Sequence, residues 1–275
     1  MFIIKPRYEC VCGTFRRSHG AERKEQFIVL NVKGKWALIT GASRGLGYLS
    51  AVFMAEHGCN LILHSRKGTE EVCAELRKFG VEAVSIAAEL SRPEEVERML
   101  GEIDKLGVRV DIVLNNAGLQ IAYRNDYFST PVSDYTESFL INTVAPAMIC
   151  YHFMPKMIEN GFGRIVNTTS GIALEPQQAG YSASKAALDK ITIDLGSTVE
   201  GTDVMINLAD PGWCRTDLGG PNAPNSPESA VPGILVGALC NDKKSGRIFR
   251  AQDFCGMTPE EAVTKAETIG SPYNS

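Results

Sequence analysis

A glycine-rich turn between an apolar strand and a helix is the feature that most constrains this chain. The run 36–40 is apolar up to its last residue, Thr40, as in a buried parallel strand, and a helical pattern follows over 45–57. Glycines let the backbone approach a pyrophosphate, and the helix N-terminus offers it free N–H groups. A lone glycine cluster suits any sharp turn, but the strand before and the helix after are the context that nucleotide binding needs. We expect a dinucleotide cradle formed by Gly41, Ser43, Arg44, Gly45, Leu46 and Gly47.

Strand and helix patterns alternate from Val32 onward. Apolar runs predict strands at 36–40, 60–64, 82–88, 110–114, 164–167, 204–208 and 246–250. Helices are predicted at 45–57, 70–79, 92–106, 133–158 and 180–199, the third of them capped by Ser91. Alternating strands and helices predict a parallel sheet covered on both faces. The fold class is therefore α/β: a Rossmann-type doubly wound parallel sheet in three layers (α/β/α) and a single domain.

The ends of the chain differ from this middle region. Residues 1–31 form a basic extension without sustained periodicity, whose purpose the sequence does not reveal. The catalytic domain is expected over 32–250, with a Pro- and Gly-rich substrate loop at about 211–233 that contains a short helical piece. A moving lid and a static surface loop both fit that composition. Residues 251–275 are expected to be an irregular tail.

The overall composition excludes several classes of partner. A net charge of −4 gives no reason to expect nucleic acid or an anionic membrane. No apolar run approaches the roughly 18 residues of a membrane span. Eight scattered cysteines favour free thiols in a reducing compartment, and so a cytoplasmic location. Cys10 and Cys12 form a CxC pair without a second pair at metal-site spacing, so no metal is expected.

The end of the second predicted strand bears on the choice of cofactor. An Asp or Glu there would accept hydrogen bonds from the ribose 2′-hydroxyl of NAD and repel a 2′-phosphate. This chain has Ser65, Arg66 and Lys67 at that point, and Arg44 lies in the glycine turn. Arginine grips phosphate in a bidentate way, so NADP(H) is favoured over NAD(H). The alternative is that these cations are only solvated loop charges.

Three later strand ends carry small, polar or proline residues at the same edge of the sheet. The fourth strand is followed by Asn115 to Gly118, the fifth by Thr168 to Gly171, and the sixth by Asp210 to Thr216. Each could be an ordinary turn or cap, but ligands of such sheets bind at the carboxyl ends of the strands. Together they point to one crevice. The further cofactor-binding candidates are Asn116, Ala117, Gly118, Pro211, Gly212, Trp213 and Thr216.

Tyr181 and Lys185 stand four residues apart on a predicted helix and so share one of its faces. An ordinary tyrosine has a pKa near ~10, and a neighbouring ammonium favours the ionised phenol. We therefore expect Lys185 to lower the pKa of Tyr181 and make it an acid–base group at neutral pH. The alternative is a half-buried tyrosine beside a solvated lysine.

These motifs, in this order, resemble the classical short-chain dehydrogenase/reductase family. The similarity covers about 32–250 and is carried by TGASRGLG, NNAG, a serine upstream of YSASK and PG-x-x-x-T. The resemblance implies a nicotinamide cofactor and hydride transfer between an alcohol and a carbonyl. It implies four catalytic roles: Tyr181 as acid/base, Lys185 as the residue that tunes it and holds the nicotinamide ribose, Ser170 as the hydrogen-bond partner of the substrate oxygen, and Asn142 as the residue that bends its helix and holds a relay water.

The chain departs from the family pattern at the catalytic serine and at the expected adenine contact. Ser170 lies eleven residues before Tyr181, where the family more often has about thirteen, so Thr168 is a second and weaker candidate for the serine role. Glu89 and Leu90 stand where the family usually has Asp and an apolar residue near the adenine, which indicates adjusted geometry there.

The leading hypothesis is an NADP(H)-dependent oxidoreductase of the carbonyl reductase or alcohol dehydrogenase type. The substrate is expected to be a small carbonyl or alcohol, neutral or partly hydrophobic, because the expected pocket walls offer few charges. Those walls are 120–123, 172–177, Trp213 and 218–232. Family resemblance implies a homodimer or homotetramer. The alternatives are a catalytically silent nucleotide-binding sensor of the same fold and an epimerase or dehydratase.

Overall fold

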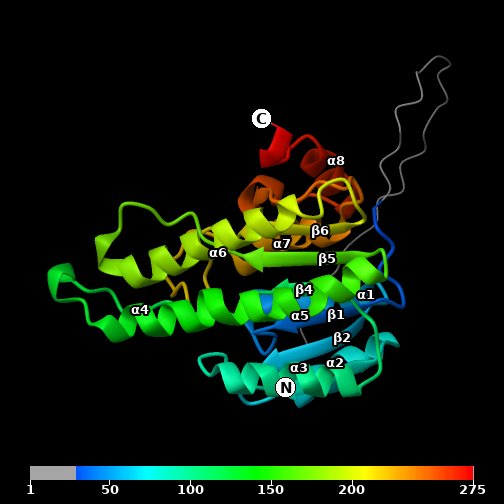
Figure 1. Ribbon diagram of the computed structural model, residues 1–275, viewed down its shortest axis with the longest axis horizontal. Coiled ribbons are helices and arrows are strands. Elements are labelled where there is room, and N and C mark those ends of the chain that lie inside the picture. Colours follow the sequence, from blue (N-terminus) through cyan, green and yellow to red (C-terminus); the bar gives the residue numbers. More distant parts are fainter. Residues whose placement is uncertain (1–28, 275) are drawn as a thin grey trace.

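The computed structural model describes residues 29–274, and its centre is one parallel sheet of seven strands (Figure 1). The strand order is β3-β2-β1-β4-β5-β6-β7, and every neighbouring pair is parallel. The strands are β1 (Trp36–Thr40), β2 (Asn60–Ser65), β3 (Ala83–Ala87), β4 (Val110–Asn115), β5 (Gly163–Thr168), β6 (Val204–Asp210) and β7 (Ile248–Arg250). The order reverses between β1 and β4, which places a ligand crevice at their carboxyl ends.

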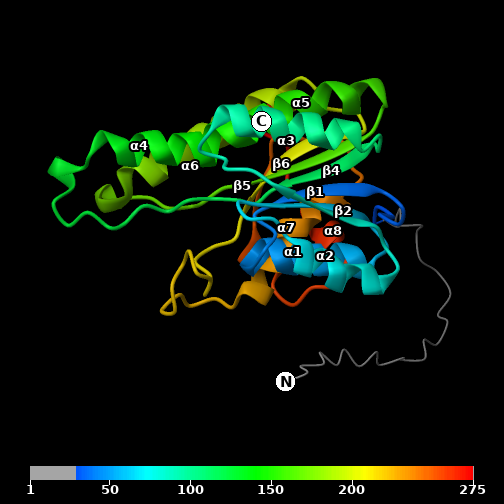
Figure 2. The same ribbon diagram turned by 90° about the horizontal axis from the view of Figure 1, so that it is seen from below.

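Helices cover both faces of the sheet, as Figure 2 shows edge-on. One layer holds α3 (Pro93–Lys105), α4 (Val132–Phe139), α5 (Ala145–Glu159) and α6 (Ala179–Ser197). The other holds α1 (Gly45–Glu56), α2 (Glu70–Leu76), α7 (Pro227–Leu239) and α8 (Pro259–Glu267). The expected three-layer, doubly wound α/β fold is confirmed.

Two hydrophobic cores result, one on each face of the sheet. Successive residues of a strand point to opposite faces. In β1, Ala37 and Ile39 therefore join the core under α1, α2, α7 and α8, while Leu38 joins the core under α3 and α5. All three are fully buried. This explains why the strand is apolar at every position rather than at alternate ones.

The expected strands agree with the observed ones to within two residues at each end, but the helices differ in two places. Ser91 is not the cap of α3: the N-cap is Arg92, without a side-chain cap bond, and Pro93 is the first helical residue. The expected helix over 133–158 is α4 and α5 joined by a π-helical segment, Leu140–Val144, that contains Asn142. The α-helical pattern is therefore interrupted at Asn142.

The C-terminal third is more ordered than expected. The loop after β6 ends at Ser226, whose hydroxyl accepts from Ser229 N, and α7 begins at Pro227. The last seven residues of the expected loop, 227–233, thus belong to α7, and the short helical piece expected there continues to Leu239. The expected irregular tail contains α8, which starts with a capping box between Thr258 and Glu261. Buried α8 residues join the core of α1, α2 and α7, so the tail packs as part of the domain.

None of the helices within residues 29–274 is long and apolar enough to cross a membrane. The N-terminal extension, with Cys10 and Cys12, lies outside the described residues apart from its last few positions.

Candidate functional site

The glycine turn between β1 and α1 is packed so tightly that side chains are excluded from it. A Cβ atom added to Gly47 would lie 2.3 Å from the Gly41 carbonyl oxygen and 2.5 Å from Asn116 Nδ2. Gly41 and Gly45 have φ angles of +67° and +57°, in the left-handed region that favours glycine. The first turn of α1 carries no acidic side chain. Its N–H groups and positive dipole end therefore suit an anion, and the residues fit the pyrophosphate of a dinucleotide.

The turn after β4 supports this cradle from behind. Asn116 Nδ2 donates to the Thr40 carbonyl at 3.1 Å, and the Thr40 hydroxyl accepts from the backbone N–H of Asn116 at 3.1 Å and of Ala117 at 3.0 Å. A Cβ on Gly41 would lie 2.9 Å from Ala117 Cα. The side-chain amide of Asn116 thus stabilises the glycine turn, while Ala117 and Gly118 line the cavity.

The cations expected at the adenosine end are present and largely exposed. Arg44 forms an ion pair with Asp217, and Arg66 lies 4.0 Å from Glu89, with both arginine side chains at least 70% exposed. Such exposed pairs are weak, so a phosphate can displace their carboxylates. The Ser65 hydroxyl donates to the Gly68 carbonyl at 2.6 Å.

Lys185 is completely buried beside the ends of β4 and β5. Its ammonium Nζ donates to the Thr168 carbonyl at 2.8 Å, and a Cβ on Gly118 would lie 3.6 Å from it. Burial lowers the pKa of Lys185 to about 8, although the carboxylate of Asp189 opposes this. Asp189, one turn further along α6, accepts a hydrogen bond from the Thr169 hydroxyl. The sequence reasoning missed Asp189, although its i, i+4 spacing from Lys185 was a usable signal.

Tyr181 is 8% exposed, and Lys185 Nζ lies 6.0 Å from the centre of its ring. Burial raises the pKa of the phenol above its ordinary value, and the negative charge of Asp210 adds to this. A side-chain hydrogen bond with Ser170 acts in the opposite direction. The groups of the protein alone therefore do not lower the pKa of Tyr181, contrary to the sequence-based expectation, because desolvation of the phenolate is the largest effect.

The two candidates for the serine role occupy different positions. Of the two side chains, Ser170 is the one that acts on Tyr181, where it lowers the pKa of the phenol, and it lines the cavity beside it. Thr168 belongs to β5 and contributes its backbone carbonyl to Lys185. The geometry thus favours Ser170, despite its short spacing.

Asn142 is fully buried and does not line the cavity. Its side-chain amide donates to the Leu119 carbonyl at 2.8 Å and to Ser184 Oγ at 3.0 Å, and its Oδ1 accepts from Leu119 N at 2.8 Å. Asn142 therefore clamps the chain just after Gly118 onto α6. This is the helix that carries Tyr181 and Lys185.

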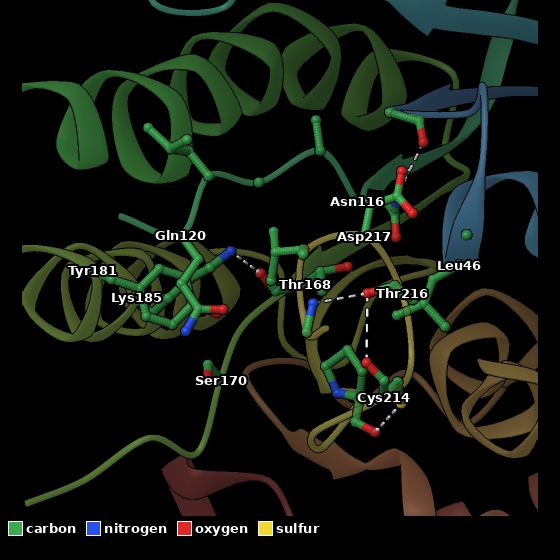
Figure 3. Close-up of a pocket in the computed structure, with 18 of the residues that line it drawn as sticks. Leu46, Asn116, Gln120, Thr168, Ser170, Tyr181, Lys185, Cys214, Thr216 and Asp217 are labelled. Atoms are coloured by element: carbon green, nitrogen blue, oxygen red, sulfur yellow. Dashed lines mark hydrogen bonds between the residues drawn. The ribbon is translucent and has the colours of Figure 1, made fainter. Parts of the chain in front are cut away.

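Most of these residues line one cavity of about 1010 Å³. Figure 3 shows Tyr181, Lys185 and Ser170 around one part of it and Leu46, Asn116 and Asp217 around another. Of the expected catalytic and cofactor residues, only Gly47 and Asn142 do not line it. The expected loop wall ends at Gly219. The carboxylates of Glu175 and Asp210, which belong to segments expected at the crevice, line the cavity, and so does Asp217, which the sequence reasoning did not place there. Within residues 29–274, no cluster of His, Cys, Asp and Glu side chains could hold a metal ion.

A Rossmann-type sheet, a glycine cradle and a buried Tyr–Lys pair in one cavity define a dinucleotide-dependent oxidoreductase. Comparison with known families agrees. Residues 35–226 match the short chain dehydrogenase family, and the chain belongs to this family, whose members are NAD(P)-dependent oxidoreductases.

Two curated relatives illustrate the similarity. A hydroxynaphthalene reductase-like protein of Metarhizium guizhouense is 31% identical over 210 residues, which are 74% of this chain and 77% of the relative. A 3-oxoacyl-[acyl-carrier-protein] reductase of Aquifex aeolicus is 30% identical over 194 residues, 69% of this chain and 77% of the relative.

Solved structures share the fold. A putative NAD(P)-dependent gluconate 5-dehydrogenase of Beutenbergia cavernae, with bound NADP, is 25% identical with a TM-score of 0.71, covering 82% of this chain and 97% of the other. A metagenomic short-chain oxidoreductase in complex with NADP is 26% identical with a TM-score of 0.62, covering 66% of this chain and 84% of the other.

Proposed function

We propose that this protein is an NADP(H)-dependent carbonyl reductase or alcohol dehydrogenase that acts on a small molecule. The observation that carries the proposal is the placement of Tyr181, Ser170 and Lys185 in the same cavity as the glycine cradle. A dinucleotide with its pyrophosphate on the cradle would extend toward these groups along the carboxyl edge of the sheet. Bound NADP(H) supplies or accepts the hydride.

The residues of the chain would handle the oxygen of the substrate and the proton. In the reductive direction, Tyr181 donates its phenolic proton to the carbonyl oxygen as that oxygen gains negative charge, and the Ser170 hydroxyl donates a hydrogen bond to the same oxygen. The buried Lys185 ammonium favours the phenolate that remains. Its contact with the Thr168 carbonyl fixes its position beside the cofactor ribose. The relay that returns the proton would run on the side of Asn142, which holds Leu119 in place.

The preference for NADP(H) over NAD(H) is part of the proposal. Its support is the pair Arg44 and Arg66, two exposed guanidinium groups at the expected position of the adenosine ribose, where β2 ends without a carboxylate. Each forms an ion pair with a single carboxylate, Arg44 with Asp217 and Arg66 with Glu89. A phosphomonoester carries about −1.5 to −2 charges and competes well for both.

Replacing Arg44 with Ala is expected to weaken NADPH binding roughly tenfold and NADH binding less than about twofold, because only NADPH carries the 2′-phosphate. The double variant with Arg66→Ala should lose the preference altogether. Dissociation constants from isothermal titration calorimetry measure both effects. Arg250→Ala, which removes an exposed cation outside the cavity, is the matched control. Equal weakening of NADPH and NADH binding in the Arg44 variant would contradict the preference.

An exposed apolar face along α5 supports assembly into oligomers. Val144, Tyr151 and Ile158 are exposed and recur every seven residues along the π-helical segment and α5, so they share a face that a second copy could cover. This supports a homodimer or homotetramer. A cytoplasmic location is supported by the described cysteines, which are all free thiols.

A further inference from the structure

Asp210 places a carboxylate at the wall of the cavity between two strand ends. It is the last residue of β6, and its Oδ1 accepts from Gly212 N at 3.0 Å. A Cβ added to Gly171, the residue after Ser170, would lie 2.7 Å from Asp210 Oδ2. The carboxylate is therefore held by one oxygen, while the other lies against the segment that carries the Ser170 hydroxyl.

The carboxylate of Asp210 also acts on the chemistry around it. Its negative charge raises the pKa values of Tyr181, Asp189 and Cys214, which places it within electrostatic reach of the phenol. Its Oδ2 has no hydrogen-bond partner elsewhere in residues 29–274, and no ion pair within that range neutralises it. One acceptor oxygen beside the reacting centre is therefore available to a ligand.

Charge is distributed unequally along the cavity. The exposed arginines, Arg44 and Arg66, belong to the glycine turn and the end of β2. Arg215, which also lines the cavity, donates to the carbonyls of Ala223 and Pro224 and is held on its own loop. The part near Ser170 and Tyr181 carries the carboxylate of Asp210 and the buried ammonium of Lys185, which donates to the Thr168 carbonyl. This revises the sequence-based expectation of a substrate wall with few charges.

We propose that Asp210 determines substrate specificity by accepting a hydrogen bond from a donor next to the reacting carbonyl. This inference rests on the proposed carbonyl chemistry. The favoured substrates are ketones or aldehydes that carry a hydroxyl or an ammonium group on the adjacent carbon. A ketone with a carboxylate at that position would face a like charge in a partly desolvated wall and is disfavoured.

Four phenyl ketones that differ only in the group next to the carbonyl test this directly. They are 1-phenylethanone (acetophenone), 2-hydroxy-1-phenylethanone, 2-amino-1-phenylethanone in its ammonium form, and benzoylformate. The measured quantity is kcat/KM with NADPH for the full-length protein. The wild type should prefer the hydroxyl and ammonium ketones over acetophenone by roughly 10-fold or more, with benzoylformate the poorest. A larger preference for ammonium than for hydroxyl identifies charge as the main contribution. Equal preference identifies the neutral hydrogen bond.

Replacing Asp210 with Asn should reduce the ratio of the ammonium ketone to benzoylformate by roughly 10- to 100-fold, because the like charge and the charged acceptor disappear together. Asp210→Glu, which keeps the charge, should retain most of the ratio. Glu175→Gln removes a carboxylate at a more exposed part of the cavity wall and should change the ratio less than about threefold. The NADPH dissociation constant and the circular dichroism spectrum show whether each variant is folded and loaded.

The outcomes separate the two proposals. If the wild type reduces these ketones but Asp210→Asn leaves the ratio within about twofold, the specificity role is refuted and the proposed function stands. If Glu175→Gln changes the ratio as much as Asp210→Asn, general pocket charge replaces the specific contact and the inference also fails. If no ketone of the series is reduced although NADPH binds, the proposed function fails and the inference fails with it.

Discussion

A Tyr181→Phe variant is expected to lose roughly a thousandfold in kcat while it still binds NADPH. The phenol of Tyr181 lines the cavity together with Ser170 and Lys185, so its removal leaves the developing alkoxide without its proton donor. Phenylalanine fills nearly the same buried space, so packing and the adjacent cradle should be preserved. Steady-state NADPH oxidation with the best ketone, together with NADPH titration by fluorescence, measures the two quantities separately.

Tyr135→Phe serves as the control for this experiment. Tyr135 lies on α4 at 39% exposure and outside the cavity, so this variant should keep full activity. Turnover by Tyr181→Phe within about tenfold of the wild type would refute the acid–base role. If both the wild type and Tyr181→Phe bind NADPH equally well but neither turns over a ketone, the nucleotide-binding sensor is favoured instead.

Replacing Arg247 with Met is expected to lower the free energy of unfolding by about 3–5 kcal/mol. The guanidinium of Arg247 is fully buried and donates to both oxygens of Asp242, at 2.5 and 2.9 Å. It also donates to the carbonyls of Lys244 and Ala266. It therefore joins the segment before β7 to α8. Methionine would leave the carboxylate of Asp242 buried without its cation. Urea unfolding followed by circular dichroism measures the loss.

Two further variants make this stability prediction specific. Arg250→Met removes an exposed arginine of β7 and should change the free energy of unfolding by less than about 0.5 kcal/mol. Adding Asp242→Asn to Arg247→Met should recover part of the loss, because the unpaired buried charge is then gone. A loss below about 1 kcal/mol in the single variant would show that this buried pair does not hold the C-terminal segment.

The sequence predicted the sheet and the cradle because local patterns determine them. An apolar strand such as Trp36–Thr40 must be buried on both faces, and only a layer of helices on each side provides that. The spacing of Tyr181 and Lys185 fixes their common face whatever surrounds it. The starts of α7 and α8 also have local sequence signals. Ser226 before Pro227 is a helix start signal, and Thr258 with Glu261 is a capping box. The many proline and glycine residues nearby nevertheless favoured an irregular segment at both places.

The direction of the Tyr181 pKa shift and the position of the Asp210 carboxylate beside Gly171 could not be predicted in this way. Whether a phenol is made more or less acidic depends on the balance of burial and charge contributed by distant segments. Here burial exceeds the effect of the Ser170 hydrogen bond. Likewise, the Asp210 carboxylate lies beside the segment of Ser170 only because Gly171, at a neighbouring strand end, allows a close approach. Gly233 allows α7 to lie against Ala251, whose Cα would be 2.3 Å from an added Cβ. Such contacts between remote residues have no periodic signature.

The proposed reaction is hydride transfer between the nicotinamide of a dinucleotide bound at the cradle and a carbonyl held by Tyr181. Transfer of deuterium from NADPH labelled with deuterium at C4 tests it most directly. Incubation of the wild type with each C4 epimer of the labelled cofactor and the best ketone, followed by mass spectrometry of the alcohol, locates the label. The account predicts that one epimer places deuterium on the carbinol carbon of the product and that the other leaves it on the cofactor. An alcohol without deuterium from either epimer, or no alcohol at all across the ketone series, would contradict it.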